Sequence, residues 1–370
     1  MRKGWEYKRW KEVLTIINGK NQSAVVDENG EYPIYGSGGI MGYANNWLCP
    51  ENCVIIGRKG NINKPIFVET KFWNVDTAFG LNANKEYLLP KFLYYFCLDY
   101  NFERHNKAVT IPSLTKADLL KIDIPLPPLS TQLAIVSELD KINELIRLKK
   151  EQLKDFDNLA QSLFFEMFGD PVENEKGWEV KKLDDVCIIT SSKRIFADEY
   201  TETGIPFYRS KEVIERSKGL PISVELFISE ERYNEIKEKF GVPKIGDILI
   251  TAVGTIGKIW AIDTDNKFYF KDGNLVWLKD IDNQLANSCF FRRLLEYLIE
   301  EYKKTNANGA AYNALTIAKQ KLMSCPLPPL SLQQLFAQRI EQIEREKSEV
   351  QKSIQDLETL LASRMQYWFE

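Results

Sequence analysis

The hexapeptide PLPPLS occurs at residues 125–130 and again at residues 326–331, in a chain where proline is otherwise sparse. Its PLPP part cannot continue a helix from the preceding residues, because proline lacks a backbone N–H and has a fixed φ. Each copy therefore marks a point where a helix begins. We expect Ser130 and Ser331 to be the N-caps of these two helices.

Apolar side chains recur at alternating spacings of three and four residues after each hexapeptide, which is the period of a coiled-coil seam. Two similar seams in one chain predict that the helices pair with each other, and a duplicated unit with a two-fold axis predicts an antiparallel pair. The alternative is that each helix packs only on its own domain. One lysine interrupts each seam: Leu139, Ile142, Ile146, Lys149, Leu153, Phe156, Ala160 and Leu163 in the first; Phe336, Ile340, Ile343, Lys347, Val350, Ile354, Leu357, Leu361, Arg364 and Trp368 in the second.

Similarity within the chain extends well beyond the hexapeptide. Residues 4–20, GWEYKRWKEVLTIINGK, and residues 177–193, GWEVKKLDDVCIITSSK, are identical at seven of 17 positions. Further matches follow in the same order, and their separation grows from 173 to 201 residues. The chain therefore contains two copies of one ancestral unit, and the largest insertion in the second copy falls in residues 210–241.

Length and composition are those of a soluble globular protein, because 370 residues with 44% apolar content are enough for two or three domains. No run reaches the roughly 18 apolar residues that span a bilayer, and the start of the chain does not resemble a secretory leader, so a cytoplasmic location is expected. The six cysteines lack the spacing of a zinc site and are expected to be free thiols.

Short β-rich runs bounded by Gly and Asn turns, each followed by a helical run, predict an α+β fold. Together with the repeat, they predict two duplicated α/β-mixed domains separated by two long antiparallel coiled-coil helices, in a pseudo-two-fold arrangement. The sequence offers little catalytic chemistry. GSGGIMGY at residues 36–43 has Met41 where a dinucleotide-binding loop needs glycine, and His105 is the only histidine. Catalysis, if any, is therefore expected to belong to a partner.

Glycine-rich polar loops are the remaining candidates for function, because Arg, Lys, Asn, Ser and Thr contact bases and phosphates while Gly permits close backbone approach. For individual glycines the competing interpretation is ordinary turn geometry, and for Arg58 and Lys59 it is a solvated hairpin. The candidate DNA-binding residues are Ser37, Gly38, Arg58, Lys59, Asn61, Asn63, Lys64 and Thr110 in the first copy, and Lys193, Arg194, Arg209, Lys211, Thr251, Thr255, Lys258, Asn308, Tyr312 and Asn313 in the second.

These features resemble the specificity subunit of type I restriction-modification systems. The resemblance is carried by the duplicated Gly-Trp opening, YPIYGSGGIMGY, VIIGRKGNINKP with WNVDTAF, SLFFEMFGDP, and PLPPLS with its following helix. It implies two target recognition domains, at residues 1–124 and 171–325, which read the halves of a bipartite asymmetric DNA site. Spacer helices would occupy residues 125–170 and 326–370.

The resemblance also implies partners. Two methyltransferase subunits would bind double-stranded DNA with this chain, chiefly through its helical regions, and methylate adenine with S-adenosylmethionine. Restriction subunits would add ATP- and Mg-dependent cleavage. No cofactor or metal would bind to the chain itself. The sequence departs from the family pattern after residues 205–207, where no GSGG loop follows. The alternatives are a non-catalytic coiled-coil protein scaffold and an unrecognised DNA-modifying enzyme.

Overall fold

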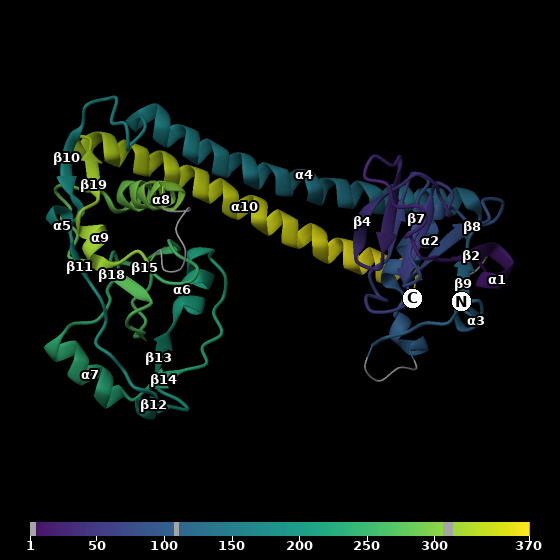
Figure 1. The fold of residues 1–370 in the computed structure, drawn as a ribbon, viewed down its shortest axis with the longest axis horizontal. Coiled ribbons are helices and arrows are strands. Elements are labelled where there is room, and N and C mark those ends of the chain that lie inside the picture. Colours follow the sequence, from purple (N-terminus) through teal and green to yellow (C-terminus); the bar gives the residue numbers. More distant parts are fainter. Residues whose placement is uncertain (1–4, 107–110, 306–313, 370) are drawn as a thin grey trace. The chain divides into compact units, whose positions relative to one another are not determined.

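A computed structural model describes residues 5–106, 111–305 and 314–369, and it has the predicted α+β fold (Figure 1). The chain divides into two compact units. Unit 1 combines Met1–Gln152 with Val350–Glu370, and unit 2 is Leu153–Glu349. Each unit holds one mixed domain and parts of two long helices. The division between the units falls inside these helices.

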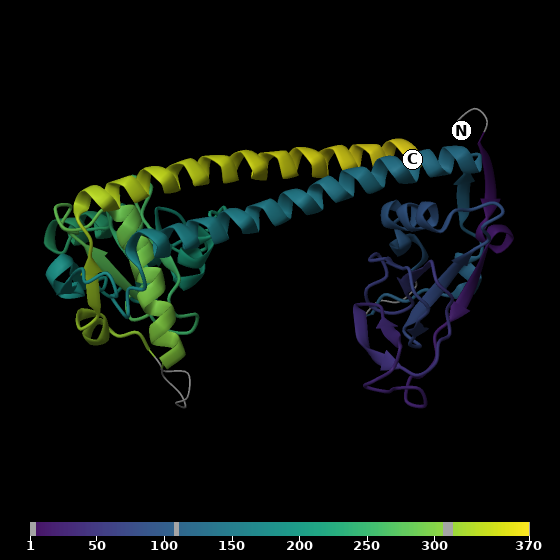
Figure 2. The same ribbon diagram turned by 90° about the horizontal axis from the view of Figure 1, so that it is seen from above.

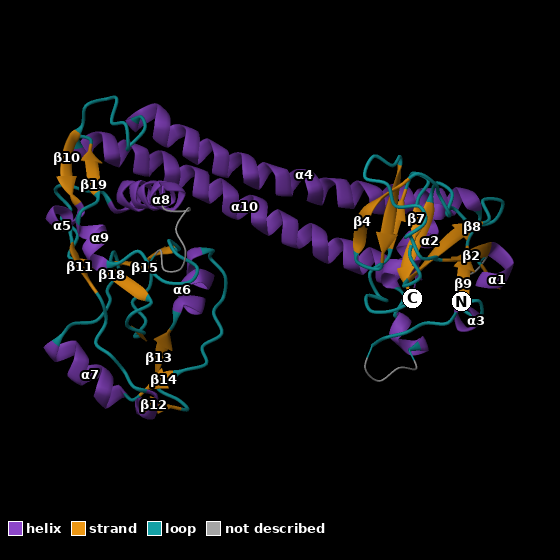
Figure 3. Cartoon of the chain, viewed as in Figure 1, coloured by secondary structure: helices purple, strands orange, loops and turns teal. Residues whose placement is uncertain are grey.

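Unit 1 builds its domain from a four-stranded sheet of order β2-β8-β5-β6, a three-stranded sheet of order β4-β3-β7 and the pair β1-β9 (Figure 3). All five residues of the central strand β5 are buried, and the helix α2 packs on the larger sheet. The elements are β1 (Glu6–Arg9), α1 (Trp10–Val13), β2 (Leu14–Asn18), β3 (Tyr32–Gly36), β4 (Gly39–Ala44), β5 (Cys53–Gly57), β6 (Ile66–Val68), β7 (Trp73–Asn74), β8 (Ala78–Ala83), α2 (Pro90–Asp99), η1 (Phe102–His105), α3 (Lys116–Leu119) and β9 (Asp123–Leu126).

Unit 2 repeats this plan with sheets of order β11-β18-β15-β16 and β12-β14-β13-β17 and the pair β10-β19. Its elements are β10 (Glu179–Lys182), α5 (Leu183–Val186), β11 (Ile188–Thr190), η2 (Ala197–Glu199), β12 (Tyr200–Thr201), β13 (Ile205–Tyr208), α6 (Ser210–Ser217), β14 (Phe227–Ile228), α7 (Glu230–Lys239), β15 (Ile248–Thr251), β16 (Ile259–Ala261), β17 (Tyr269–Phe270), β18 (Leu275–Lys279), α8 (Ser288–Thr305), α9 (Ile317–Lys321) and β19 (Ser324–Leu327).

The duplication predicted from the sequence is visible element by element. Strand β1 pairs with β9 in unit 1 as β10 pairs with β19 in unit 2, and both pairs are antiparallel. In each unit one strand of the second sheet pairs in parallel with a two-residue strand that begins with an aromatic residue, β3 with β7 and β13 with β17. The copies differ after that strand. Unit 1 continues into β4, and unit 2 continues into α6, β14 and α7, where the insertion was expected.

The helices α4 (Leu129–Phe168) and α10 (Leu330–Phe369) have 40 residues each and pair in both units (Figure 2). In unit 1, Lys150 of α4 pairs with Glu358 of α10 at 2.7 Å, and Glu138 pairs with Arg364. In unit 2, the rings of Phe164 and Phe336 pack with centroids 5.8 Å apart. Residue numbers rise along one helix as they fall along the other, so the pairing is antiparallel, as predicted.

Residues of the predicted seam are buried in both helices, among them Leu139 and Ala160 of α4 and Phe336 and Ile354 of α10. Leu139 and Phe336 also belong to the domain cores of unit 1 and unit 2. Lys347, the lysine that interrupts the second seam, forms an ion pair of 2.8 Å with Asp157 on α4. The interruption in that seam is therefore a contact between the helices.

The N-cap prediction was wrong. Helix α4 begins at Leu129, and the N–H of Gln132 donates to the carbonyl of Pro128, so Pro128 occupies the cap position and Ser130 lies inside the first turn. Pro329 has the same place before α10. The reason is that the first two residues of each hexapeptide end a β-strand, which leaves the proline pair to make the whole connection. Each helix therefore begins two residues earlier than a serine N-cap would require.

The two ends of unit 1 also meet. Trp5 precedes β1, and Trp368 belongs to the last turn of α10, yet their rings stack with centroids 6.3 Å apart and planes within 5°. Phe369 packs on Phe92 and Phe96 of α2. Residues of α10 therefore complete the core of the domain that begins at residue 5.

Candidate functional site

The turn between β3 and β4 and the loop after β5 come together in unit 1. A Cβ placed on Gly38 would lie 3.7 Å from Asn61 Nδ2, and one placed on Gly60 would lie 3.9 Å from Ser37 Oγ. The segment that precedes α3 joins them, because the N–H of Gly60 donates to the carbonyl of Pro112 at 3.0 Å. Loops distant in sequence thus form one surface.

The loop of residues 57–64 is held by its backbone. The N–H groups of Arg58 and Lys59 both donate to the carbonyl of Thr77, and the carbonyl of Arg58 accepts from Leu114. Gly60 has a φ of +80°, a conformation that other residues rarely adopt. With the backbone fixed, the side chains of Arg58, Lys59, Asn61 and Lys64 are exposed on a rigid frame.

Three cations of this loop, Arg58, Lys59 and Lys64, have no ion-pair partner among the described residues. Arg58 only donates to the carbonyl of Asp76 at 3.5 Å and lies over the ring of Phe79. Asn63 differs from its neighbours, because its side-chain oxygen accepts from the N–H of Phe102 at 2.8 Å and so joins the loop to η1. Thr110 lies outside the described residues.

The equivalent loop of unit 2, residues 251–258, keeps the frame and changes the side chains. The carbonyl of Ala252 accepts from the N–H of Leu315, as that of Arg58 does from Leu114, and Gly254 has a φ of +75°. Thr255 is exposed and Lys258 is half-buried. Thr251 is fully buried, and its hydroxyl is used by the carbonyl of Thr255 and the N–H of Lys258, so it supports the loop and does not face a ligand.

Three other predicted cations of unit 2 form ion pairs with acidic side chains. Arg194 pairs with Asp272 at 2.8 Å, while Arg209 and Lys211 both pair with Glu225. These two cations lower the pKa of Glu225 to about 2, so its charge persists. A nucleic acid would have to displace these carboxylates first. Lys193 lies over the ring of Phe240, and Asn308, Tyr312 and Asn313 lie outside the described residues.

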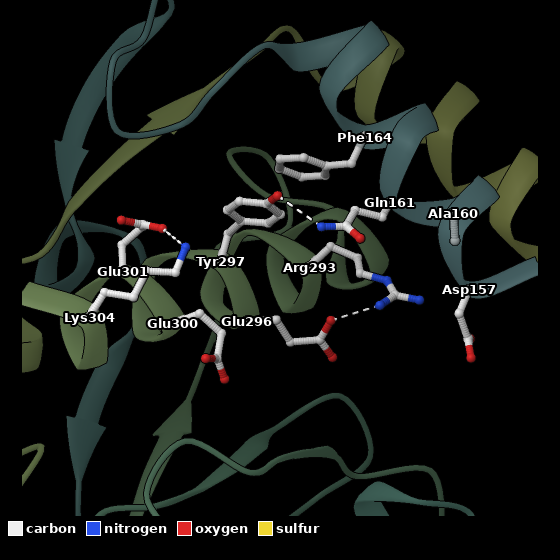
Figure 4. A pocket seen from close by; sticks show the side chains of 10 residues that line it. All are labelled: Asp157, Ala160, Gln161, Phe164, Arg293, Glu296, Tyr297, Glu300, Glu301 and Lys304. Atoms are coloured by element: carbon white, nitrogen blue, oxygen red, sulfur yellow. Dashed lines mark hydrogen bonds and ion pairs between the residues drawn. The ribbon is translucent and has the colours of Figure 1, made fainter. Parts of the chain in front are cut away.

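A pocket of about 410 Å³ lies in unit 2 between α4 and α8 (Figure 4). Its walls carry the ion pairs Arg293–Glu296 and Lys304–Glu301, and the side-chain amide of Gln161 donates to the hydroxyl of Tyr297 at 3.2 Å. Its acidic side chains outnumber its basic ones, which disfavours phosphate ligands. No cluster of His, Cys, Asp or Glu within the described ranges could hold a metal ion.

Sequence reasoning missed two sets of residues. Gln132 and Gln333 are completely buried at the starts of α4 and α10. The signal was available, since glutamine follows each PLPPLS after one residue. Ile40, Met41 and Tyr43 of β4 are exposed beside the loop surface. The six cysteines, expected to be free thiols, form no disulfide; five are buried and Cys289 is partly buried. No helix in the part of the chain that the structure describes could cross a bilayer.

Comparisons with known proteins agree with one another. The family described as type I restriction modification DNA specificity domain matches residues 2–155 and 175–359. A Haemophilus influenzae protein described as a type I restriction enzyme specificity subunit is 28% identical over 353 residues, which cover 92% of this chain and 87% of that protein. One solved structure comes from work on assembly and conformational transition of the type I R-M system. It has a TM-score of 0.65 at 20% identity, and the match covers 99% of this chain and 97% of that chain. The crystal structure of a type I restriction-modification system S subunit from M. genitalium has a TM-score of 0.56 at 17% identity, and the match covers 99% of this chain and 96% of that one.

Proposed function

The chain belongs to the family of type I restriction-modification DNA specificity subunits, and from this premise we propose that it reads a bipartite, asymmetric DNA site. Members of the family are non-catalytic and have no cofactor of their own; they direct DNA recognition for a complex that methylates and restricts. In the proposal, residues 1–124 and 171–325 are two target recognition domains. Residues 125–170 and 326–370 are the spacer helices between the half-sites.

One observation carries this proposal: the two units share a loop frame that displays different side chains. The frame is the hydrogen bond from Leu114 to Arg58 in unit 1 and from Leu315 to Ala252 in unit 2. Unit 1 exposes Arg58, Lys59 and Asn61 there. At the matching positions unit 2 has the buried Ala252, the half-buried Val253 and the exposed Thr255. Two domains that recognise different DNA sequences are expected to share a backbone arrangement and to differ in the side chains that it carries.

The proposed DNA contacts are predicted residues that are exposed or half-buried. In unit 1 they are Ser37, Gly38, Arg58, Lys59, Asn61 and Lys64, and in unit 2 Lys193, Thr255 and Lys258. Asn63 and Thr251 act through the loop backbone that they hold. Arg194, Arg209 and Lys211 contact DNA only where phosphate displaces their acidic partners. The residues Thr110, Asn308, Tyr312 and Asn313 complete the proposed set.

The proposed partners are double-stranded DNA, two methyltransferase subunits and restriction subunits. The methyltransferase subunits would bring S-adenosylmethionine, and the restriction subunits ATP and Mg. The helices offer a surface for them, because Leu133, Leu145 and Leu148 of α4 are between 46% and 61% exposed. Leu133 and Leu145 flank a shallow, mainly apolar depression along the helix. Exposed leucines on one helix face favour a helical partner.

Methylation-sensitive sequencing of DNA from cells with and without the gene tests the proposal. We expect methylated adenine in one bipartite motif only when the gene is present. Replacing residues 171–325 with the matching segment of another family member should change one half of the motif and leave the other intact. If DNA modification is independent of the gene, or both halves change together, the proposal fails. A protein scaffold would leave the motif unaltered, and an enzyme would methylate or cleave DNA without partners.

A further inference from the structure

The strand β4 has an irregularity beside the loop surface of unit 1. The pairing of β3 with β4 steps from Ile34–Gly42 to Tyr35–Ile40, so that Met41 is an extra residue, a β-bulge. β4 is an edge strand in its three-stranded sheet. Bulges at sheet edges re-aim side chains and are common next to functional sites.

The bulge exposes consecutive apolar side chains. In regular strands neighbouring side chains point to opposite faces, and one of the two is usually covered. Here Ile40 is 57% exposed and Met41 is 63% exposed. The sulfur of Met41 would lie 2.6 Å from a Cβ at residue 36, so Gly36 leaves the space that Met41 occupies. The backbone is thus arranged to place the methionine at the surface.

This apolar pair adjoins the polar loop surface. Ile40 follows directly on the turn of Ser37 to Gly39, whose Ser37 lies near Gly60. The Cβ position of residue 36 is also close to Val75. Val75 lies two residues before Thr77, whose carbonyl accepts hydrogen bonds from the N–H groups of Arg58 and Lys59. Unpaired cations, an asparagine and two apolar side chains therefore meet on one surface. The positive charge matches DNA, and lysine is unusual at the centre of a protein interface.

Resting on the proposed function, we propose that Ile40 and Met41 are specificity-determining residues that contact the 5-methyl group of thymine in the major groove. Thymine is the one base that presents a methyl group there, and apolar side chains are its usual partners. The half-site read by unit 1 then contains at least one A·T pair recognised through this methyl group. Unit 2 has no equivalent of the bulged strand β4, because α6 follows β13 where β4 follows β3 in unit 1.

The test measures binding of the complex of the full chain with its methyltransferase subunits to duplexes of its target, in which each thymine in turn is replaced by deoxyuridine. The replacement removes only the methyl group. Burial of one methyl group predicts that at least one position in one half-site weakens binding about fourfold for the unaltered chain. A variant with Ile40→Ala and Met41→Ala should bind thymine and deoxyuridine equally at that position, and should keep any discrimination in the other half-site.

Ile188→Ala is the matched control, since Ile188 is an isoleucine of similar exposure, 50%, on a strand of unit 2. It should leave the thymine preference of the first half-site unchanged. The inference is overturned if the double variant still discriminates thymine from deoxyuridine, or if no position responds in the unaltered complex. Either result leaves the proposed function standing. Absence of any specific binding would instead overturn both.

Discussion

Gln132 and Gln333 make the same three hydrogen bonds, each in its own unit. The side-chain oxygen of Gln132 accepts from the N–H of Leu89 at 2.9 Å, and its amide donates to the carbonyls of Tyr87 and Pro127. Gln333 does the same with Asn287, Leu285 and Pro328. One side chain thus holds together the start of the helix, the hexapeptide and the segment before the domain's own helix.

Substitution of Gln132 by alanine is expected to destabilise unit 1 by about 3 kcal/mol, because one buried and two partly buried backbone groups lose their partner. Hydrogen exchange of the purified chain should show the loss of protection around residues 87–89, with unit 2 unaffected. Gln334→Ala serves as the control, since Gln334 is exposed on the same helical turn as Gln333. Equal effects of the two substitutions would contradict this role.

Glu138 should stabilise the helix pair of unit 1 in a pH-dependent way. The Arg364 guanidinium, with help from Trp368, holds the pKa of Glu138 below its usual range. The stabilisation is therefore complete above the unfolded pKa of about 4.3 and is lost as the pH falls through the lower folded value. Because both partners are about a third exposed, we expect Glu138→Gln to cost about 1 kcal/mol at pH 7.

Urea unfolding at pH 7 and at pH 3 measures this difference, and the two proteins should converge at the lower pH. Glu358→Gln removes a more exposed ion pair with Lys150 and should have a smaller effect. A difference between the Glu138 variant and the unaltered protein that persists undiminished at pH 3 would show that the carboxylate charge is not responsible.

Arg58→Ala is expected to weaken specific DNA binding of the complex about tenfold. The expected loss corresponds to one charged contact, and loss of a phosphate contact would also lower the slope of log affinity against log salt by about 0.9. Fluorescence anisotropy at several salt concentrations measures both. Lys121→Ala removes a cation that pairs with Asp118, and it should change neither quantity.

Glu225→Gln should strengthen DNA binding at low salt. The carboxylate pairs with Arg209 and Lys211; its removal frees Lys211 and leaves Arg209 paired with Glu212 alone. We expect about a threefold gain in affinity at low ionic strength that disappears at high ionic strength, where exposed charges are screened. Unchanged or weaker binding at low salt would place Arg209 and Lys211 away from the DNA.

Leu133→Glu combined with Leu145→Glu should remove one of the two proposed methyltransferase subunits, because a buried carboxylate without a partner opposes docking. Light scattering of the reconstituted complex measures the stoichiometry. The matched positions of the second copy are already polar, Gln334 and Glu346, so Gln334→Glu should leave the stoichiometry unchanged. If the double variant still bound two subunits, the docking surface would have to lie elsewhere on the chain.

The sequence predicts the helices of this protein better than its surface chemistry. The seam is readable because a spacing of three and four residues has few other physical causes, and the structure buries Leu139 and Ile354 as expected. The state of Lys211 is different. Its ion pair with Glu225 depends on a loop that returns over 14 residues, which no local pattern specifies. Burial of Thr251 likewise results from the fold of its own loop.

The composition of unit 1 from two separate stretches of the chain has a consequence for synthesis. A ribosome completes residues 153–349 before it makes Val350–Glu370, the stretch that carries Trp368 to its stack on Trp5. The second unit can therefore reach its native contacts while the first, although translated earlier, still lacks its final helix. The nascent first unit must wait with part of its apolar core open, so the part made first is the last to finish folding.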